Sequence, residues 1–142
     1  MTVRNVRNNN PGNMRVGQPW RGQMPRSQMN ADQKAETDFC VFIDPPYGFR
    51  AMKKQLEAYH FMHGCRSVRD YITRWAPPDD NNDTEAYIAF VAHHVGVGAD
   101  DPQDIAAPDF LKRMMKAIAT QETGGWDGYW LDSDLEKGFS LG

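Results

Sequence analysis

Residues 7–15 read Arg7-Asn8-Asn9-Asn10-Pro11-Gly12-Asn13-Met14-Arg15, and the rest of the chain is organised around this stretch. Four asparagines, a Pro-Gly pair and two arginines stand in these nine residues, a composition that no apolar core can use. Pro fixes φ at about −65° and Gly accepts the positive φ of a type II turn, so the pair predicts a tight turn. An asparagine side chain both donates and accepts hydrogen bonds. The loop therefore either folds onto its own backbone or presents its amides to a polar ligand such as a sugar.

The sequence after this loop predicts a small β-hairpin. Residues 37–43 alternate in polarity, with Phe39, Val41 and Ile43 on one face, which is typical of a strand. We expect this strand to pair with residues 14–16. The polar residues between the two segments predict a long loop or hairpin tip, and long ordered loops are often functional.

Four amphipathic helices are predicted in the rest of the chain. Apolar residues recur every three or four positions along 47–63, 68–76, 84–95 and 108–123. Gly64 follows the first helix, Ser67 precedes the second, and Pro108 opens the fourth. The third helix can be capped by Asn82, Asp83 or Thr84. After the fourth helix, residues 126–142 predict a short tail.

Composition narrows the class of protein. The chain has 142 residues, of which 40% are hydrophobic and 25% charged, and this fits one globular domain over 1–142. A formal net charge of −3 and the lack of a Lys/Arg stripe argue against a nucleic-acid partner. No apolar run suits a signal peptide or a membrane span, so we expect synthesis in the bacterial cytoplasm. Cys40 and Cys65 lack metal-site or CxxC spacing and predict free buried thiols.

Glu122 is the candidate for acid chemistry. It continues the apolar stripe of Leu111, Met115 and Ile118 at the end of the last predicted helix, so it should face the interior. Burial and the negative end of the helix dipole both raise a carboxyl pKa. A carboxylic acid that stays protonated near neutral pH can protonate the leaving oxygen of a glycosidic bond. The alternative is a last-turn glutamate that swings out into water.

Other chemistries find less support in the sequence. A second carboxylate is not obvious: Glu36 and Asp38 lie in the hairpin region, Glu57 on a solvated face and Glu85 near a helix cap. The histidine pairs at 60/63 and 93/94 lack a third ligand, so no metal is expected. No GxSxG, GxGxxG or GxxxxGK[ST] motif occurs, and no cofactor is expected.

Three blocks of the chain together resemble small phage and prophage proteins that are virion components or lysozyme-like. The blocks are residues 7–15, 42–51 and 74–87, the last containing Arg-Trp-Ala-Pro-Pro and Asn-Asp-Thr. The chain is also distantly similar to bacterial glucosaminidases of the flagellar type, in which a helix ending in Glu-Ser-Gly carries the acid. Here the stretch 121–125, Gln-Glu-Thr-Gly-Gly, resembles that helix end but stands last in the chain. The resemblance therefore implies a circularly permuted lysozyme-like fold.

This resemblance implies an α+β fold, a mostly helical lysozyme-like domain with a small β-hairpin, which binds peptidoglycan glycan strands and cuts their β-1,4 linkage. Glu122 is then the general acid. The other candidate site residues contact the sugar, and they are Asn8, Asn10, Arg15, Trp20, Trp75 and Tyr87. The asparagines and the arginine line the cleft, the tryptophans offer stacking faces, and the tyrosine assists by hydrogen bonding. For Trp75 a place in the core is the favoured alternative.

Two rival functions come from other classes. A non-catalytic virion protein would keep the fold and bind the cell wall or other virion proteins without cutting. An amidase or peptidase acting on the stem peptide is disfavoured, because no metal or nucleophile motif occurs. For the glycosidase, we expect action in the virion, the periplasm or the cell wall.

Overall fold

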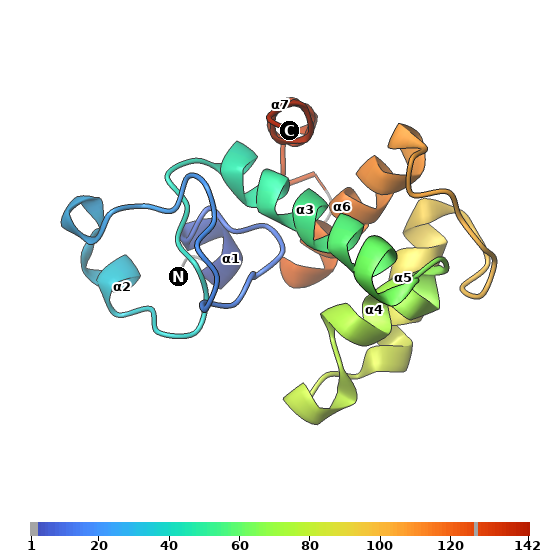
Figure 1. Ribbon diagram of the computed structural model, residues 1–142. Coiled ribbons are helices and arrows are strands. Elements are labelled where there is room, and N and C mark those ends of the chain that lie inside the picture. The colour runs from blue at the N-terminus through green and yellow to red at the C-terminus, as the bar shows by residue number, and fades with distance from the viewer. Residues whose placement is uncertain (1–2, 127) are drawn as a thin grey trace.

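The computed structural model describes residues 3–126 and 128–142, which are mostly helical (Figure 1). Within these residues the chain forms seven α-helices and two short 3-10 helices. The α-helices are α1 (Arg4–Arg7), α2 (Ala31–Lys34), α3 (Pro45–His63), α4 (Val68–Trp75), α5 (Thr84–Val95), α6 (Pro108–Glu122) and α7 (Asp132–Ser140). The 3-10 helices are Arg26–Gln28 and Pro78–Asp80. In the described part of the chain, no helix has the length and apolar character that crossing a bilayer requires.

The four predicted helices are confirmed as α3 to α6. Gly64 ends α3 in the left-handed conformation, at φ 70°, where a side chain would be strained. Ser67 caps α4 in a reciprocal capping box with Asp70. Among the three candidates for α5, Asp83 is the cap, and its carboxylate accepts a hydrogen bond of 3.1 Å from the Ala86 N–H.

The predicted β-hairpin is not confirmed. Over residues 3–126 and 128–142 the strand pairing consists of two isolated bridges, Arg15 with Phe39 and Gln23 with Phe42. Residues 39–43 have backbone neighbours on both sides. On one side the N–H of Cys40 donates to the Met14 carbonyl, and on the other the N–H of Met24 donates to the Val41 carbonyl, each at 2.8 Å. Neither side continues into a ladder, so the α+β expectation reduces to a mostly helical fold.

Asparagine side chains explain why the ladder stops. The Nδ2 of Asn10 donates to the carbonyl of Cys40 at 2.9 Å, and the Nδ2 of Asn9 donates to the carbonyl of Phe42 at 2.9 Å. The Phe42 N–H in turn donates to the carbonyl of Asn8 at 2.8 Å. The loop at 7–15 thus satisfies backbone groups of 39–43 that a neighbouring strand would otherwise bind.

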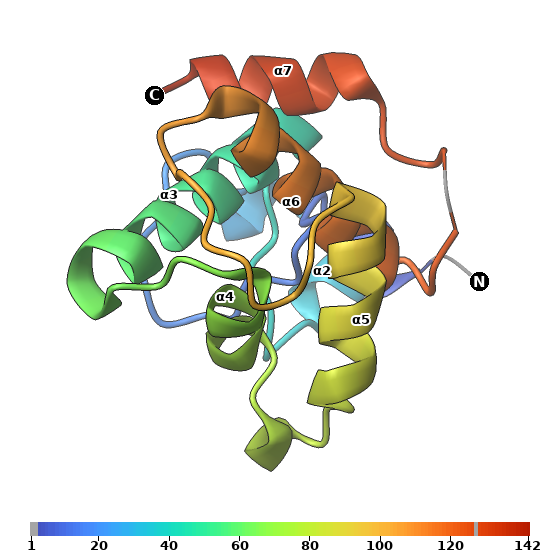
Figure 2. The same ribbon diagram turned by 90° about the vertical axis from the view of Figure 1, so that its right-hand side faces the viewer.

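Helix α7 lies in the residues predicted as a tail, and it packs along α3 (Figure 2). The two helices are in close contact at Gly138. A Cβ added there would collide with the carbonyl oxygen of Pro46 and the Cβ of Phe49. Close packing therefore requires glycine at a position where helix propensity disfavours it.

The apolar core lies between α3, α4, α5 and α6. Its largest fully buried side chains include Phe49, Met52, Leu56, Tyr71, Ile72, Leu111, Met114, Met115 and Ile118. Residues 3–43, coloured blue to cyan in Figure 1, form the end of the molecule next to the start of α3. Gly48 lets the loop reach α3, because a Cβ there would lie 2.5 Å from the Asn9 carbonyl oxygen and from Pro11 Cδ. The asparagine loop is thereby fixed against the helical part.

Candidate active site

Glu122 is the last residue of α6, and two side chains from distant parts of the chain hold its carboxyl group. The Nδ2 of Asn13 donates to Oε1 at 2.7 Å. The hydroxyl of Tyr87, on α5, donates to Oε2 at 2.8 Å. The carboxyl group therefore points inward, and the alternative of a last-turn glutamate turned into water does not describe the structure.

The surroundings of Glu122 raise the pKa of its carboxyl group. Burial is the main cause, while the hydrogen bonds from Asn13 and Tyr87 and the charge of Arg15 lower the pKa by less. The pKa of Tyr87 is raised well above its ordinary value, first by burial and then by the neighbouring Glu122 charge. Tyr87 therefore keeps its proton and acts as a hydrogen-bond donor to Glu122.

The turn in the asparagine loop places Asn13 beside Glu122. The Asn13 N–H donates to the carbonyl of Asn10 at 3.0 Å and closes a turn around Pro11 and Gly12. Positive φ falls on Asn9, at 51°, and on Asn13, at 49°, and not on Gly12 as the type II prediction required. Asparagine tolerates this conformation better than most residues.

Gly12 serves close packing. A Cβ there would lie 2.7 Å from the Trp75 ring and 2.8 Å from Met52 Cε. The absence of a side chain lets the turn lie against Trp75, and the next residue, Asn13, then reaches Glu122.

The Asn13 amide can serve either protonation state of Glu122. Its Nδ2 donates to the carboxyl group, while its Oδ1 is buried and has no hydrogen-bond partner among the described residues. A half-turn of the amide would present Oδ1 as an acceptor to a protonated Glu122. Asn13 thus offers the Oδ1 acceptor to the protonated form of Glu122 and the Nδ2 donor to its carboxylate form.

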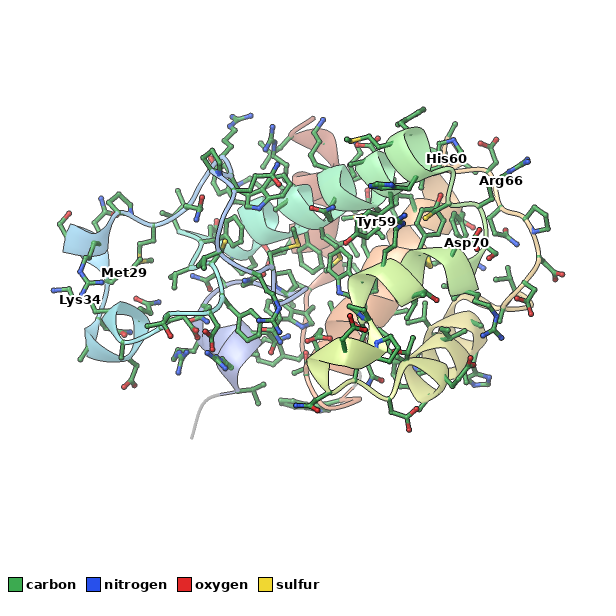
Figure 3. The ribbon with its side chains drawn as sticks, turned by 60° about the horizontal axis from the view of Figure 1, so that its bottom comes forward. Met29, Lys34, Tyr59, His60, Arg66 and Asp70 are labelled. Atoms are coloured by element: carbon green, nitrogen blue, oxygen red, sulfur yellow. The ribbon has the colours of Figure 1, made fainter. Side chains whose placement is uncertain are left out.

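A pocket of about 390 Å³ lies next to this pair. Residues 12–18 and Trp20 supply its N-terminal wall, and Gln55 and Tyr59 of α3, Arg74 and Trp75 of α4, and Pro77 supply the remainder. Tyr59 extends from α3 toward α4, where its hydroxyl donates to the carbonyl of Arg74 at 3.4 Å (Figure 3). Asn13 belongs to the wall, so Glu122 adjoins the pocket through Asn13.

The pocket wall contains both aromatic rings and polar groups. Trp20, Trp75 and Tyr59 contribute rings, and Tyr59 and Trp75 contact each other edge to face with centroids 6.4 Å apart. Trp75 also packs against both apolar clusters, so the core and pocket roles foreseen for it coexist. A flat apolar surface beside amide and guanidinium donors is the composition that sugar rings bind.

The expectation that Asn8 and Asn10 line the cleft is wrong. Both are fully buried. The Nδ2 of Asn8 donates to Oε1 of Glu36 at 2.9 Å. The Nδ2 of Asn10 donates to two backbone carbonyls, and its Oδ1 accepts from the Met14 N–H at 2.8 Å. These side chains bind within the protein, in agreement with the alternative prediction that the loop folds onto its own backbone. They keep no hydrogen-bonding group for a ligand.

The other candidates divide into two groups. Arg15, Trp20 and Trp75 line the pocket. Tyr87 lies behind it, 5% exposed, and contacts Glu122. Sequence reasoning missed Asn13, Gln55, Tyr59 and Arg74. Asn13 is part of the asparagine stretch at 7–15. Its position directly after Pro-Gly could have indicated that its side chain points in a different direction from those of Asn8 and Asn10.

The carboxylates considered as a second catalytic group do not line the pocket. The Glu36 side chain is fully buried, with Arg4 Nε at 2.7 Å and Arg7 Nη2 at 2.6 Å from Oε1. Glu85 pairs with Arg69. Within 3–126 and 128–142 no cluster of three metal-ligating side chains was found, and both cysteines are buried free thiols, as predicted.

No protein-family model matches this sequence. A comparison with curated proteins finds Protein P5 of Pseudoalteromonas phage PM2, which is 32% identical over 144 aligned positions. The alignment covers 99% of this chain and 82% of Protein P5. The chain therefore belongs to the same family as Protein P5, and its kinship with a bacteriophage protein agrees with the phage origin that the sequence resemblance implied.

Proposed function

We propose that this member of the Protein P5 family cuts the glycan strands of peptidoglycan, with Glu122 as the general acid. One observation carries the proposal: a carboxyl group with a raised pKa is held by Tyr87 and by Asn13, and Asn13 lines a pocket with aromatic walls. A phage relative is compatible with this substrate, because a phage must pass the wall of its bacterial host.

The proposed chemical step is one proton transfer coupled to one bond cleavage. Glu122 gives its proton to the glycosidic oxygen while the bond from that oxygen to the anomeric carbon breaks. The leaving sugar departs as an alcohol, and positive charge develops on the other ring. Glu122 becomes a carboxylate, and the donors on Asn13 and Tyr87 stabilise the charge that appears there.

The pocket walls in the described residues hold no Asp or Glu, and Glu122 adjoins them only through Asn13, so the proposal assigns no nucleophile to the protein. The positive ring is then captured either by water or by a hydroxyl of the same sugar, and the Glu122 carboxylate takes up the proton that the attacking oxygen loses. Water leaves a reducing end, whereas an internal hydroxyl leaves an anhydro sugar. Mass spectrometry of the released fragments distinguishes these products and identifies which sugar carries the new end.

The deciding experiment compares the wild type with Glu122→Gln on purified sacculi. The substitution keeps the shape of the side chain and removes the transferable proton, so we expect solubilisation to fall by at least roughly a hundredfold. Glu57→Gln is the matched control, since Glu57 lies on α3 and is not part of the pocket wall. Thermal unfolding of all three proteins checks that the variants are folded.

The rival function, a phage protein that binds without cutting, gives a different pattern in the same experiment. Co-sedimentation with sacculi measures binding in parallel with release of soluble fragments. A wild type that sediments with sacculi and releases nothing would rule out the glycosidase and favour the binding protein. Equal release by the wild type and Glu122→Gln would remove Glu122 from the mechanism.

A further inference from the structure

We infer that the pocket next to Glu122 selects glycan strands that carry carboxylate groups, and that Arg15 and Arg74 are the residues that select them. The inference rests on the proposed glycan substrate and adds the chemical class that distinguishes it from neutral polysaccharides. It assigns these two arginines a role in specificity, and the charge of Arg15 also lowers the pKa of Glu122.

The pocket is positively charged although the chain as a whole carries a formal net charge of −3. Arg15 enters the wall from the asparagine loop, and Arg74 enters it from α4. No Asp or Glu side chain belongs to the wall in the residues that the structure describes. Two arginine side chains in a wall without an acidic residue favour a ligand with negative charge.

Arg15 and Arg74 differ from the arginines of the molecule that form ion pairs. Arg4 and Arg7 share the carboxylate of Glu36, and Arg69 pairs with two acidic residues. Neither Arg15 nor Arg74 forms an ion pair with any described residue, and both are exposed. Their charges are therefore available to a ligand.

Arg15 is oriented without being neutralised. Its guanidinium carbon lies 5.2 Å from the centroid of the Phe39 ring, a cation–π arrangement that restrains the side chain and leaves the donors on its edge uncommitted. A guanidinium held in this way can give two parallel hydrogen bonds to a carboxylate, which a hydroxyl cannot accept in the same geometry.

A second hollow, of about 500 Å³, shares Arg74 with the first and lies between the end of α3 and α4. Its lining includes His63, Cys65, Arg69, Thr73 and one acidic residue, Asp70. In Figure 3 this end of the molecule is marked by His60, Arg66 and Asp70. Because Asp70 lines the second hollow and Arg69 is paired with Glu85 and Asp100, the carboxylate contact is assigned to Arg74 itself, where the two hollows meet.

Peptidoglycan has the required chemistry. Every second sugar of its strands bears a lactyl group that ends in a carboxylate or continues into an acidic stem peptide. Chitin has the same β-1,4-linked N-acetylglucosamine backbone without these groups. The two arginines would therefore favour the first polymer over the second, in a manner that salt weakens.

The test measures binding with the Glu122→Gln protein, so that the strands are not consumed. Soluble glycan strands are compared with the same strands after their carboxylates have been coupled to glycinamide. We expect roughly tenfold weaker binding after coupling, since each exposed ion pair is worth up to about a fivefold factor. Adding Arg15→Gln or Arg74→Gln should weaken binding to native strands by about threefold each, so that the two losses together match the effect of coupling. Neither substitution should change binding to coupled strands. Arg26→Gln is the control, because Arg26 lies outside both hollows.

Two results would overturn the inference. One is equal binding of native and coupled strands. The other is a loss in the arginine variants that is the same for both kinds of strand, which would indicate a general packing role. The proposed function fails separately, if the wild type does not cleave native strands. Selective binding without cleavage would keep the carboxylate site and reject the enzyme, and cleavage without selectivity would do the reverse.

Discussion

The hydroxyl of Tyr87 lies 2.8 Å from Oε2 of Glu122 and donates a hydrogen bond to it from within the protein. Burial of Glu122 and this hydrogen bond have opposite effects on the pKa of the acid. Burial raises the pKa of Glu122, and the tyrosine hydrogen bond lowers it. The pKa of Glu122 is thus set by burial at the end of α6, which raises it, against the hydrogen bonds from Asn13 and Tyr87 and the charge of Arg15, which lower it.

Tyr87→Phe should weaken the proposed activity and change its pH dependence. Loss of a hydrogen bond to a charged group corresponds to roughly a tenfold to hundredfold lower rate. A general acid must be protonated, and removal of this donor raises the pKa of Glu122. The high-pH limb of the rate profile should therefore move to higher pH. Tyr129→Phe, in the segment after α6, is the control. A lower rate with an unmoved limb would contradict the assigned role.

Glu122 should lower the stability of the folded protein at neutral pH. Its folded-state pKa is raised by burial, so its stabilising contribution is complete below the ordinary glutamate pKa of 4.5 and is lost as pH rises through the folded value. Glu122→Gln should therefore unfold at a higher temperature than the wild type at pH 7, and this advantage should disappear near pH 4. Calorimetry at both pH values measures the difference. An advantage that grows on acidification would mean that the pKa is lowered.

Glu36, in contrast to Glu122, should raise the stability of the folded protein at neutral pH. Hydrogen bonding from Arg4 holds the pKa of its carboxyl group far below the ordinary value of 4.5. Its contribution is therefore present above that value and is lost as pH falls. Because the Arg4 side chain is 44% exposed and can turn to water, Glu36→Gln should cost about 2 kcal/mol at pH 7, below the usual range for a fully buried pair.

Denaturant unfolding at pH 7 and pH 3 tests the Glu36 prediction, and the difference between variant and wild type should shrink at pH 3. Asp38→Asn is the control, since Asp38 contacts the same arginine from a 58% exposed position. An unchanged midpoint for Glu36→Gln at pH 7 would show that the buried ion pair does not hold α1 to the loop.

Gly138→Ala should loosen the contact between α7 and α3. The added Cβ meets the backbone of Pro46, which cannot rotate away, so we expect a loss of about 1–3 kcal/mol despite the better helix propensity of alanine. Ser133→Ala on the exposed start of α7 is the control and should lie within about 0.5 kcal/mol of the wild type. Stabilisation by Gly138→Ala would mean that the two helices can separate without cost.

Apolar spacing and capping residues predicted the helices well, but the composition of the loop at 7–15 did not predict where its side chains point. The boundaries of α3 to α6 follow from apolar spacing and from Gly64, Ser67 and Pro108, because these determinants act within one or two turns. Helix α7 carries a glycine in its last turn and only a few apolar side chains, so its sequence does not predict a helix, and tertiary packing stabilises it instead.

The asparagine stretch shows where sequence reasoning stops. Its composition indicated a polar role for every asparagine, yet Asn8 and Asn10 bind within the protein and Asn13 faces the acid. The three side chains are chemically identical, and only the direction in which the backbone turns separates them. Tyr59 and Arg74 join the pocket through the packing of α3 on α4, which no local pattern encodes.

The contact between Asn13 and Glu122 joins positions 109 residues apart. During translation the amide leaves the ribosome long before the acid, and a nascent chain has no partner for it until α6 has been made. If the wall-cutting role holds, activity therefore switches on only after both ends have docked. Partial products of synthesis would be inert toward the cell that makes them.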